Sequence, residues 1–188
     1  MSKKVPKARR REKKTDYKQR LGLLKSGNPR LVVRKSSGNT VTQIVRWKED
    51  GDEVIEQAEA QDLRELGWKG HTGNLPSAYL AGFLLGSKVE NDIGKCVLDI
   101  GLQETTRENR IYAALKGAMD AGIEVSVGEE MLPSEDRIRG EHIEEHASEM
   151  NSKKKKEHFS SLIERSQDPE NISENFEEVK KNIAEGDY

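Results

Sequence analysis

The chain has 188 residues, of which 33% are hydrophobic and 35% are charged, so it can form one well-buried domain with extensions but not a core throughout. Its longest apolar stretch, residues 80–85, is far too short to span a membrane, and the N-terminus has no apolar signal segment. A lone cysteine, Cys96, excludes an internal disulfide and a cysteine-based zinc site, and we expect it to be buried. These features predict a cytoplasmic protein.

Charge is distributed very unevenly along the chain. The first 48 residues contain 16 Lys and Arg but only two acids, Glu12 and Asp16, so they carry +14 while the whole chain carries −2. The remaining residues therefore carry −16. Such a division indicates that the basic quarter serves a polyanion, and nucleic acid is the expected partner. Aromatic residues make up only 5%, which favours contacts to phosphate over rows of stacking rings.

The basic quarter begins with residues 1–14, which have no periodic apolar pattern. We expect this arm to be disordered until phosphate orders it, and a merely solvated tail is the alternative. Between Tyr17 and Lys25, three leucines alternate with basic residues, which predicts a short helix lying along both the core and RNA.

Strand signals follow the arm. Residues 30–35 and 41–47 flank a turn at residues 37–39, which predicts a hairpin. Residues 53–56 favour a third strand, although they could also begin a helix. Residues 58–66 are expected to be helical, with Leu63 and Leu66 facing inward.

The next segments alternate between helix and strand. Asn74 is a suitable N-cap for a helix to about Val89, in which Gly82 and Gly86 form a flat seam for close packing rather than a dimerisation motif. Residues 96–102 form a nearly unbroken apolar run, which predicts the central strand of the sheet. Asn109 can cap a further helix that ends at Gly122, and residues 123–127 alternate briefly. The expected fold of residues 15–133 is an α/β sandwich with a mixed sheet.

Residues 134–188 form a charged extension with 15 acids and nine basic residues. We expect two or three helices, weakly attached to the core, with Ser173 capping the last one and a neighbouring protein as their partner. Lys153–Lys156 form the only basic run outside the N-terminal quarter. It is either a second RNA contact or, more commonly for such runs, a solvated face.

No arrangement in the sequence assembles a catalytic or metal site. His142 and His146 lack the Glu that a zinc-protease helix needs after its first histidine. Gly67, Gly70 and Gly73 resemble a glycine-rich turn more than a phosphate loop, because no strand leads directly into them and no Lys-Ser/Thr pair follows. Asp99 lies within an apolar run, where a structural hydrogen bond is its usual fate.

Six stretches together resemble the L-eighteen family of large-subunit ribosomal proteins, which binds 5S ribosomal RNA, in its archaeal and eukaryotic branch. The stretches are Thr15–Leu21, Asn28–Arg34, Gly73–Leu80, Val97–Leu102, Ala113–Ala118 and Arg137–His142. They occur in order over roughly residues 5–145, and the absence of a long C-terminal extension favours an archaeal member. The sequence after about Met150 matches no part of this pattern.

The resemblance implies a non-enzymatic structural component of the large subunit, without cofactor or metal. It would bind 5S rRNA, help to attach it to the 23S-type rRNA in the central protuberance, and contact neighbouring large-subunit proteins. The implied RNA contacts are Arg9, Arg10, Arg11, Lys13, Lys14, Tyr17, Arg20, Arg30, Arg34, Lys69, Asn74 and Arg139. Residues 105–110 depart from the family pattern, and Glu108 there would repel phosphate.

Two other hypotheses remain open from the sequence. One is an enzyme acting on RNA or nucleotides that uses Gly67–Gly73 as a phosphate cradle. The other is a non-ribosomal interaction module that uses its acidic C-terminal helices.

Overall fold

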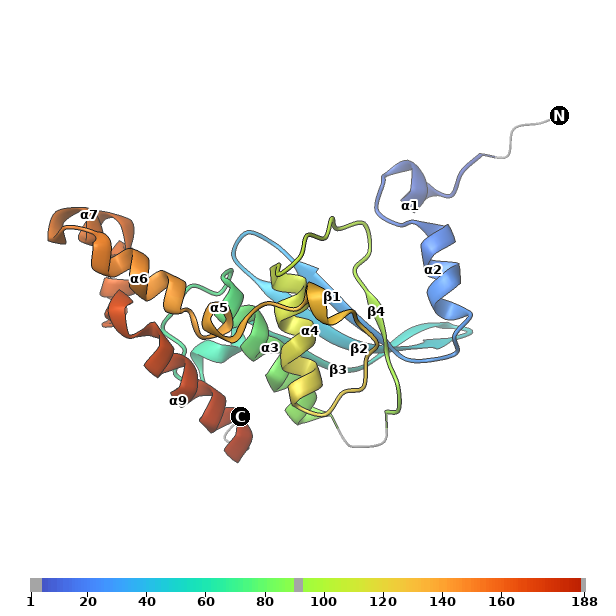
Figure 1. The fold of residues 1–188 in the computed structure, drawn as a ribbon. Coiled ribbons are helices and arrows are strands. Elements are labelled where there is room, and N and C mark those ends of the chain that lie inside the picture. The colour runs from blue at the N-terminus through green and yellow to red at the C-terminus, as the bar shows by residue number, and fades with distance from the viewer. Residues whose placement is uncertain (1–4, 90–92, 187–188) are drawn as a thin grey trace.

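The computed structural model describes residues 5–89 and 93–186, so residues 1–4 of the predicted arm lie outside the described residues. Its centre is a four-stranded sheet in the order β3-β2-β1-β4. Strands β1 (Arg30–Lys35), β2 (Thr40–Lys48) and β3 (Gly51–Glu59) are antiparallel, whereas β4 (Val97–Asp99) is parallel to β1. Helices pack on this mixed sheet (Figure 1), which confirms the predicted α/β class and the predicted hairpin.

Strand β4 lies at the edge of the sheet, so the prediction of a central strand was wrong. Only Val97–Asp99 form a ladder, and Cys96 makes an isolated bridge to Val125. The apolar run is explained by the hydrophobic core, which includes Cys96 and against which Leu98 and Ile100 pack. The alternating residues 123–127 supply this bridge rather than a strand.

Helices α3 (Leu75–Lys88) and α4 (Arg110–Asp120) cover one face of the sheet. Each starts where predicted, because the side chain of Asn74 accepts a hydrogen bond from the Ser77 N–H and that of Asn109 accepts one from the Ile111 N–H. Gly122, with φ +103°, follows α4 in the left-handed conformation that favours glycine. Both predicted helices are confirmed.

The predicted glycine seam holds α3 against α4. A Cβ on Gly82 would lie 1.9 Å from the carbonyl oxygen of Ala114, and one on Gly86 would lie 2.5 Å from the Ala121 Cβ. Gly117 of α4, which the prediction did not include, belongs to the same seam, because its Cβ would lie 2.0 Å from the Tyr79 carbonyl oxygen. The seam therefore serves packing within the chain.

Residues 58–66 are not the helix that their sequence indicated. Ala58 and Glu59 belong to β3, and only a 3-10 turn, η1 (Asp62–Arg64), follows. Pairing with β2 along β3 outweighs the local helical preference. Leu63 and Leu66 are nevertheless buried, as predicted.

The C-terminal extension contains more helices than predicted, and the last one is firmly attached. It comprises α5 (Glu135–Arg139), α6 (Glu141–Glu149), α7 (Ser152–His158), α8 (Ser160–Glu164) and α9 (Ile172–Glu185). Short 3-10 turns, η2 (Glu129–Met131) and η3 (Pro169–Asn171), precede α5 and α9. Phe176, Val179 and Ile183 of α9 are buried in the same hydrophobic core as α3, so weak attachment was wrong for this helix.

Ser173 does not cap α9. It lies inside the first turn, where its N–H and hydroxyl both donate to Glu144 of α6. This contact ties α6 to α9 instead.

At the other end of the molecule, α1 (Ala8–Arg11) and α2 (Tyr17–Leu24) lie beside the sheet without a buried residue in either helix (Figure 1). The predicted helix after Tyr17 is thus confirmed. The single turn α1 falls within the arm that we expected to be disordered without RNA, and its lack of burial leaves little to hold it in place.

Candidate nucleic-acid interface

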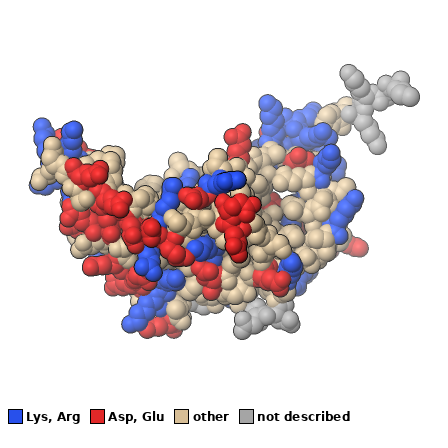
Figure 2. Space-filling model, in the orientation of Figure 1, with Lys and Arg blue, Asp and Glu red and all other residues tan. Residues whose placement is uncertain are grey.

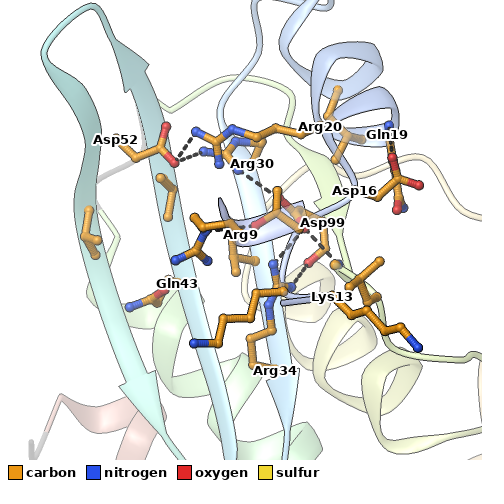
Figure 3. Close-up of a pocket in the computed structure, with 18 residues that line it drawn as sticks. Arg9, Lys13, Asp16, Gln19, Arg20, Arg30, Arg34, Gln43, Asp52 and Asp99 are labelled. Carbon is orange, nitrogen blue, oxygen red and sulfur yellow. Dashed lines mark hydrogen bonds and ion pairs between the residues drawn. The ribbon is translucent and has the colours of Figure 1, made fainter. Parts of the chain in front are cut away.

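A groove of about 520 Å³ separates the arm and α2 from the sheet face opposite α3 and α4 (Figure 3). Six of the twelve predicted RNA contacts line it, so the structure brings half of the predicted site together: Arg9, Lys13, Lys14, Arg20, Arg30 and Arg34. They come from three elements, namely the arm, α2 and β1. We call this hollow the basic groove.

The alternation of side chains along β1 places its arginines in the basic groove. Leu31 and Val33 are fully buried on the face that packs against the helices. Arg30, Val32 and Arg34 point to the other face and line the groove. One strand thus supplies side chains both to the core and to the groove.

A chain of five charged side chains crosses the floor of the basic groove (Figure 3). Asp52, at the start of β3, lies 2.7 Å from both Arg20 of α2 and Arg30 of β1. Arg30 also lies 2.8 Å from Asp99, which in turn lies 2.8 Å from Arg34. We call this series, Arg20–Asp52–Arg30–Asp99–Arg34, the ion ladder.

Burial is deepest at the middle of the ion ladder. The side chains of Arg30 and Asp99 are 3% and 8% exposed, whereas that of Arg34 is 40% exposed. Arg30 is therefore enclosed between two carboxylates, with little surface left for a phosphate. Arg34 keeps part of its guanidinium open to the groove.

The carboxylates of the ion ladder are held in the charged form. Burial alone raises the pKa of Asp99, but hydrogen bonds and charge from Arg34 and Arg30, with the Gly101 N–H, outweigh burial and lower it. The pKa of Asp52 is lowered in the same way, because Arg20 and Arg30 outweigh its desolvation. The predicted structural hydrogen bond at Asp99 is confirmed, with partners that the sequence did not identify.

Asp99 also fixes the orientation of Arg34. The Arg34 NH1 donates to the Asp99 carbonyl oxygen at 2.6 Å and to the Val33 carbonyl oxygen at 2.9 Å, while NH2 donates to the Asp99 carboxylate. A guanidinium held at three acceptors has lost most of its rotational freedom before any ligand arrives. It can then present its remaining N–H groups to an oxygen in one geometry.

The arm side of the groove is held by fewer contacts. Asp16 caps α2 by accepting from the N–H groups of Lys18 and Gln19, and Arg9 donates to the Thr15 hydroxyl. Arg20 is the ion-pairing link from α2 to the sheet in the described residues. This side is consequently the one best able to adjust to a ligand.

Three predicted contacts near the arm lie outside the basic groove. Arg10 and Arg11 are exposed, and Tyr17 is half-buried, with the Lys7 ammonium 4.7 Å from its ring centre. Arg10 and Arg11 directly follow Arg9, and Tyr17 directly follows Asp16, so all three are close in the chain to residues that line the groove. Figure 2 shows this concentration of Lys and Arg at the N-terminal end.

The other three predicted contacts lie on elements away from the groove. The Lys69 N–H donates to Asn175 of α9, Asn74 is occupied as the cap of α3, and Arg139 of α5 lies 3.4 Å from Glu177 of α9. The structure therefore groups Lys69 and Arg139 with the C-terminal helices rather than with β1.

The glycine-rich segment does not form a phosphate cradle. The Lys69 N–H is bonded to Asn175 and the Gly73 N–H to His71. A Cβ on Gly73 would lie 2.2 Å from the Ser37 carbonyl oxygen, so this glycine allows the loop to pack against the hairpin turn. Gly70 and Gly73 serve packing and Gly67 serves a turn with φ +94°, which removes the structural basis of the nucleotide-enzyme hypothesis.

Metal binding finds no support in the part of the chain that the structure describes, where no three His, Cys, Asp or Glu side chains gather as ligands. Desolvation, and then the charge of Arg137, lower the pKa of His142 and so keep this histidine neutral. Glu108, expected to repel phosphate, lies 3.5 Å from Arg137.

Sequence reasoning missed Asp52 and Gln43 as groove residues. Gln43 lies within β2 and Asp52 at the start of β3, next to a turn. Polar residues are common at such positions, so neither residue indicates a binding site in the sequence. Alternation along β2 could have placed Gln43 on the same face as Val41 and opposite Thr42. The pairing of Asp52 with Arg30 depends on the β1–β2–β3 order and had no local signal.

Comparison with known proteins decides the family. A family model described as "Ribosomal large subunit proteins 60S L5, and 50S L18" matches residues 2–94 and 90–127. The large ribosomal subunit protein uL18 of Methanococcus maripaludis is 45% identical over 182 residues, which cover 95% of this chain and 94% of that protein. The chain belongs to this family of large-subunit ribosomal proteins.

Membership confirms the predicted resemblance, including its similarity to an archaeal member. As a member of the L5/L18 family, the protein is a structural, non-enzymatic component of the large ribosomal subunit, with ribosomal RNA and ribosomal proteins around it. None of the helices in residues 5–89 and 93–186 has the length and apolar character needed to cross a membrane.

Proposed function

We propose that this L5/L18-family protein binds 5S rRNA with its arm and basic groove, and helps to attach that RNA to the large-subunit rRNA in the central protuberance. The observation that carries the proposal is the basic groove, where cations from the arm, α2 and β1 face one hollow. A surface of this kind fits a polyanion, and the family places the protein among ribosomal RNAs.

The basic residues of the groove have different roles in this proposal. Arg9, Lys13 and Lys14 exchange counterions of the RNA for direct phosphate contacts. Arg34, already oriented by Asp99, donates to phosphate oxygens in a fixed fork. Tyr17, at the start of α2, stacks on an exposed base.

Arg30 acts indirectly. Its guanidinium is enclosed by Asp52 and Asp99, so it holds the two carboxylates that position Arg20 and Arg34. The buried middle of the ion ladder thus keeps the floor of the groove rigid, while the arm supplies cations that can follow the RNA.

Of the contacts outside the groove, Arg10 and Arg11 extend the phosphate-binding surface of the arm. Lys69, Asn74 and Arg139 remain secondary candidates for RNA contact. The acid-rich helices α6 and α9 would face neighbouring large-subunit proteins rather than RNA, because a phosphate backbone is repelled by carboxylates.

The test measures affinity for 5S rRNA across a salt series. About six phosphate contacts would give a slope of log affinity against log salt on the order of −4 to −5. The variant Arg9→Gln/Lys13→Gln/Lys14→Gln should flatten this slope by roughly 2 to 3, because each lost phosphate contact removes about 0.7 to 0.9.

The matched control is Arg64→Gln/Lys95→Gln/Lys181→Gln, which removes the same charge from exposed positions outside the groove. This control should leave the slope within about one unit of the parent. Equal slopes for the two triple variants would remove the basic groove from the mechanism.

A further inference from the structure

Lys153–Lys156 lie on α7 at the end of the molecule opposite the arm (Figure 1). They are surrounded by an extension rich in acids, which appear as the red surface on the left of Figure 2. Blue side chains appear in Figure 2 at the upper left, where Figure 1 places α7. We call Lys153, Lys154 and Lys156 the α7 cluster.

The fourth lysine of the run has a different, structural role. Lys155 is partly buried and pairs with Glu170, and it lies 3.9 Å from Asp168. With Asn151, which caps α7 by accepting from the Lys154 N–H, this pair fixes the helix against the segment before α9. One lysine therefore anchors α7.

The α7 cluster itself is exposed and makes no ion pair with any residue that the structure describes. This is unexpected beside so many acids, since neutralisation was available within the extension. Like charges three residues apart on a helix, such as Lys153 and Lys156, destabilise it slightly, and α7 has no buried residue to compensate. An external anion would remove this repulsion.

The chemistry of the α7 cluster favours RNA over protein. Lysine is depleted at the centres of protein interfaces, because burying its ammonium group and ordering its long stem are costly. Phosphates of RNA, by contrast, are bound by exposed lysines as point charges, without desolvation of a large apolar surface. No member of the cluster is buried enough to form an interface core.

The position of the α7 cluster separates it from the basic groove. In Figure 1, α7 and the arm rise at opposite ends on the same side of the molecule, with the core between them. The acidic surface next to α7 in Figure 2 would repel a phosphate backbone that passed from one basic site to the other. Two separate RNA segments fit this arrangement better than one continuous segment.

We propose that Lys153, Lys154 and Lys156 form a second RNA-binding site, which contacts the phosphate backbone of large-subunit rRNA while the basic groove holds 5S rRNA. The inference rests on the proposed function, because it names the residues that would contact large-subunit rRNA when 5S rRNA is attached to it. It predicts binding without base recognition, since ammonium groups at a helix surface read only charge and spacing.

The experiment uses the full chain with Lys153→Gln/Lys154→Gln/Lys156→Gln, and Lys153→Arg/Lys154→Arg/Lys156→Arg as the charge-conserving control. Affinities for a 5S rRNA transcript and for a large-subunit rRNA transcript are measured separately across a salt series. The glutamine variant should bind large-subunit rRNA at least about tenfold more weakly at low salt, with a slope flatter by roughly 2 to 3. The arginine variant should match the parent.

Affinity for 5S rRNA should stay within about twofold of the parent in both variants, because the groove is unchanged. Unchanged binding of large-subunit rRNA by the glutamine variant overturns the inference, as does an equal loss in the arginine variant. An equal loss of 5S binding also overturns it, because the cluster would then serve the same RNA as the groove. Failure of the parent to bind 5S rRNA counts against the proposed function alone, because binding of large-subunit rRNA is measured separately.

Discussion

Removing the charge of Asp99 should lower the free energy of unfolding far more than removing one partner of an exposed ion pair. The substitution Asp99→Asn leaves the Arg30 guanidinium, whose side chain is 3% exposed, with Asp52 as its remaining ion-pair partner. Breaking a buried pair from one side typically costs about 3–5 kcal/mol, because the remaining charge stays away from water. Asp52 partly compensates Arg30, and Arg34 can turn to solvent, so we expect the lower end, about 3 kcal/mol.

Urea unfolding followed by circular dichroism measures this loss, provided that the slope of the free energy against urea is unchanged. The loss corresponds to a fall in Tm of roughly 6–12 °C for a chain of this size. Glu53→Gln is the matched control, because the Lys48–Glu53 pair has a similar distance, 2.7 Å, but is exposed on both sides. It should cost less than about 1 kcal/mol. A loss below about 1 kcal/mol for Asp99→Asn as well would refute the role assigned to burial.

The same ion ladder predicts a particular dependence of stability on acid. The pKa values of Asp99 and Asp52 are lowered in the folded protein, so below the ordinary carboxyl pKa, about 4, the unfolded chain binds more protons than the folded chain. Their stabilisation is therefore complete above that pH and is lost as the pH falls through the lower folded values. In Asp99→Asn, this acid-dependent loss should be smaller, which a series of unfolding curves between about pH 5 and pH 2 would show.

Three further predictions test the packing. Gly117→Ala should cost about 1–3 kcal/mol or more, because the new Cβ would meet the Tyr79 carbonyl oxygen at 2.0 Å. The control Gly22→Ala, in exposed α2 with nothing within 4 Å, should be neutral or stabilise the protein by up to about 1 kcal/mol. Urea unfolding measures both changes. Phe176→Ala should cost about 3–5 kcal/mol and keep one cooperative transition if α9 belongs to the core, and a separate early transition would contradict this. Burial raises the pKa of Cys96 to about 11, so stability should fall as the pH rises from about 9 to 11, and native protein should resist thiol reagents at pH 8.

Local signals in the sequence predicted the starts of two core helices correctly, although the predicted cap Ser173 lies inside α9. Asn74 and Asn109 cap the helices that they were predicted to start, and Gly82 lies in the close seam that its spacing indicated. Caps and turns depend on hydrogen bonds between residues two or three positions apart, so they can be recognised in the sequence. Three predictions failed where the arrangement of distant elements decides the outcome. Residues 58–66 partly pair with β2, residues 96–102 supply an edge strand rather than the central one, and the apolar stripe of α9 is buried in the core.

The sequence by itself determined the sign of the charge and the segment of the chain that carries it, since +14 in the first 48 residues does not depend on the fold. Only the tertiary structure decided which of those cations face a ligand. Arg30 and Asp99 are 69 residues apart, and the parallel pairing of β1 with β4 brings them together. Because burial between two carboxylates removes a guanidinium from the surface, Arg30 supports the groove while Arg34, four residues later, remains open to it.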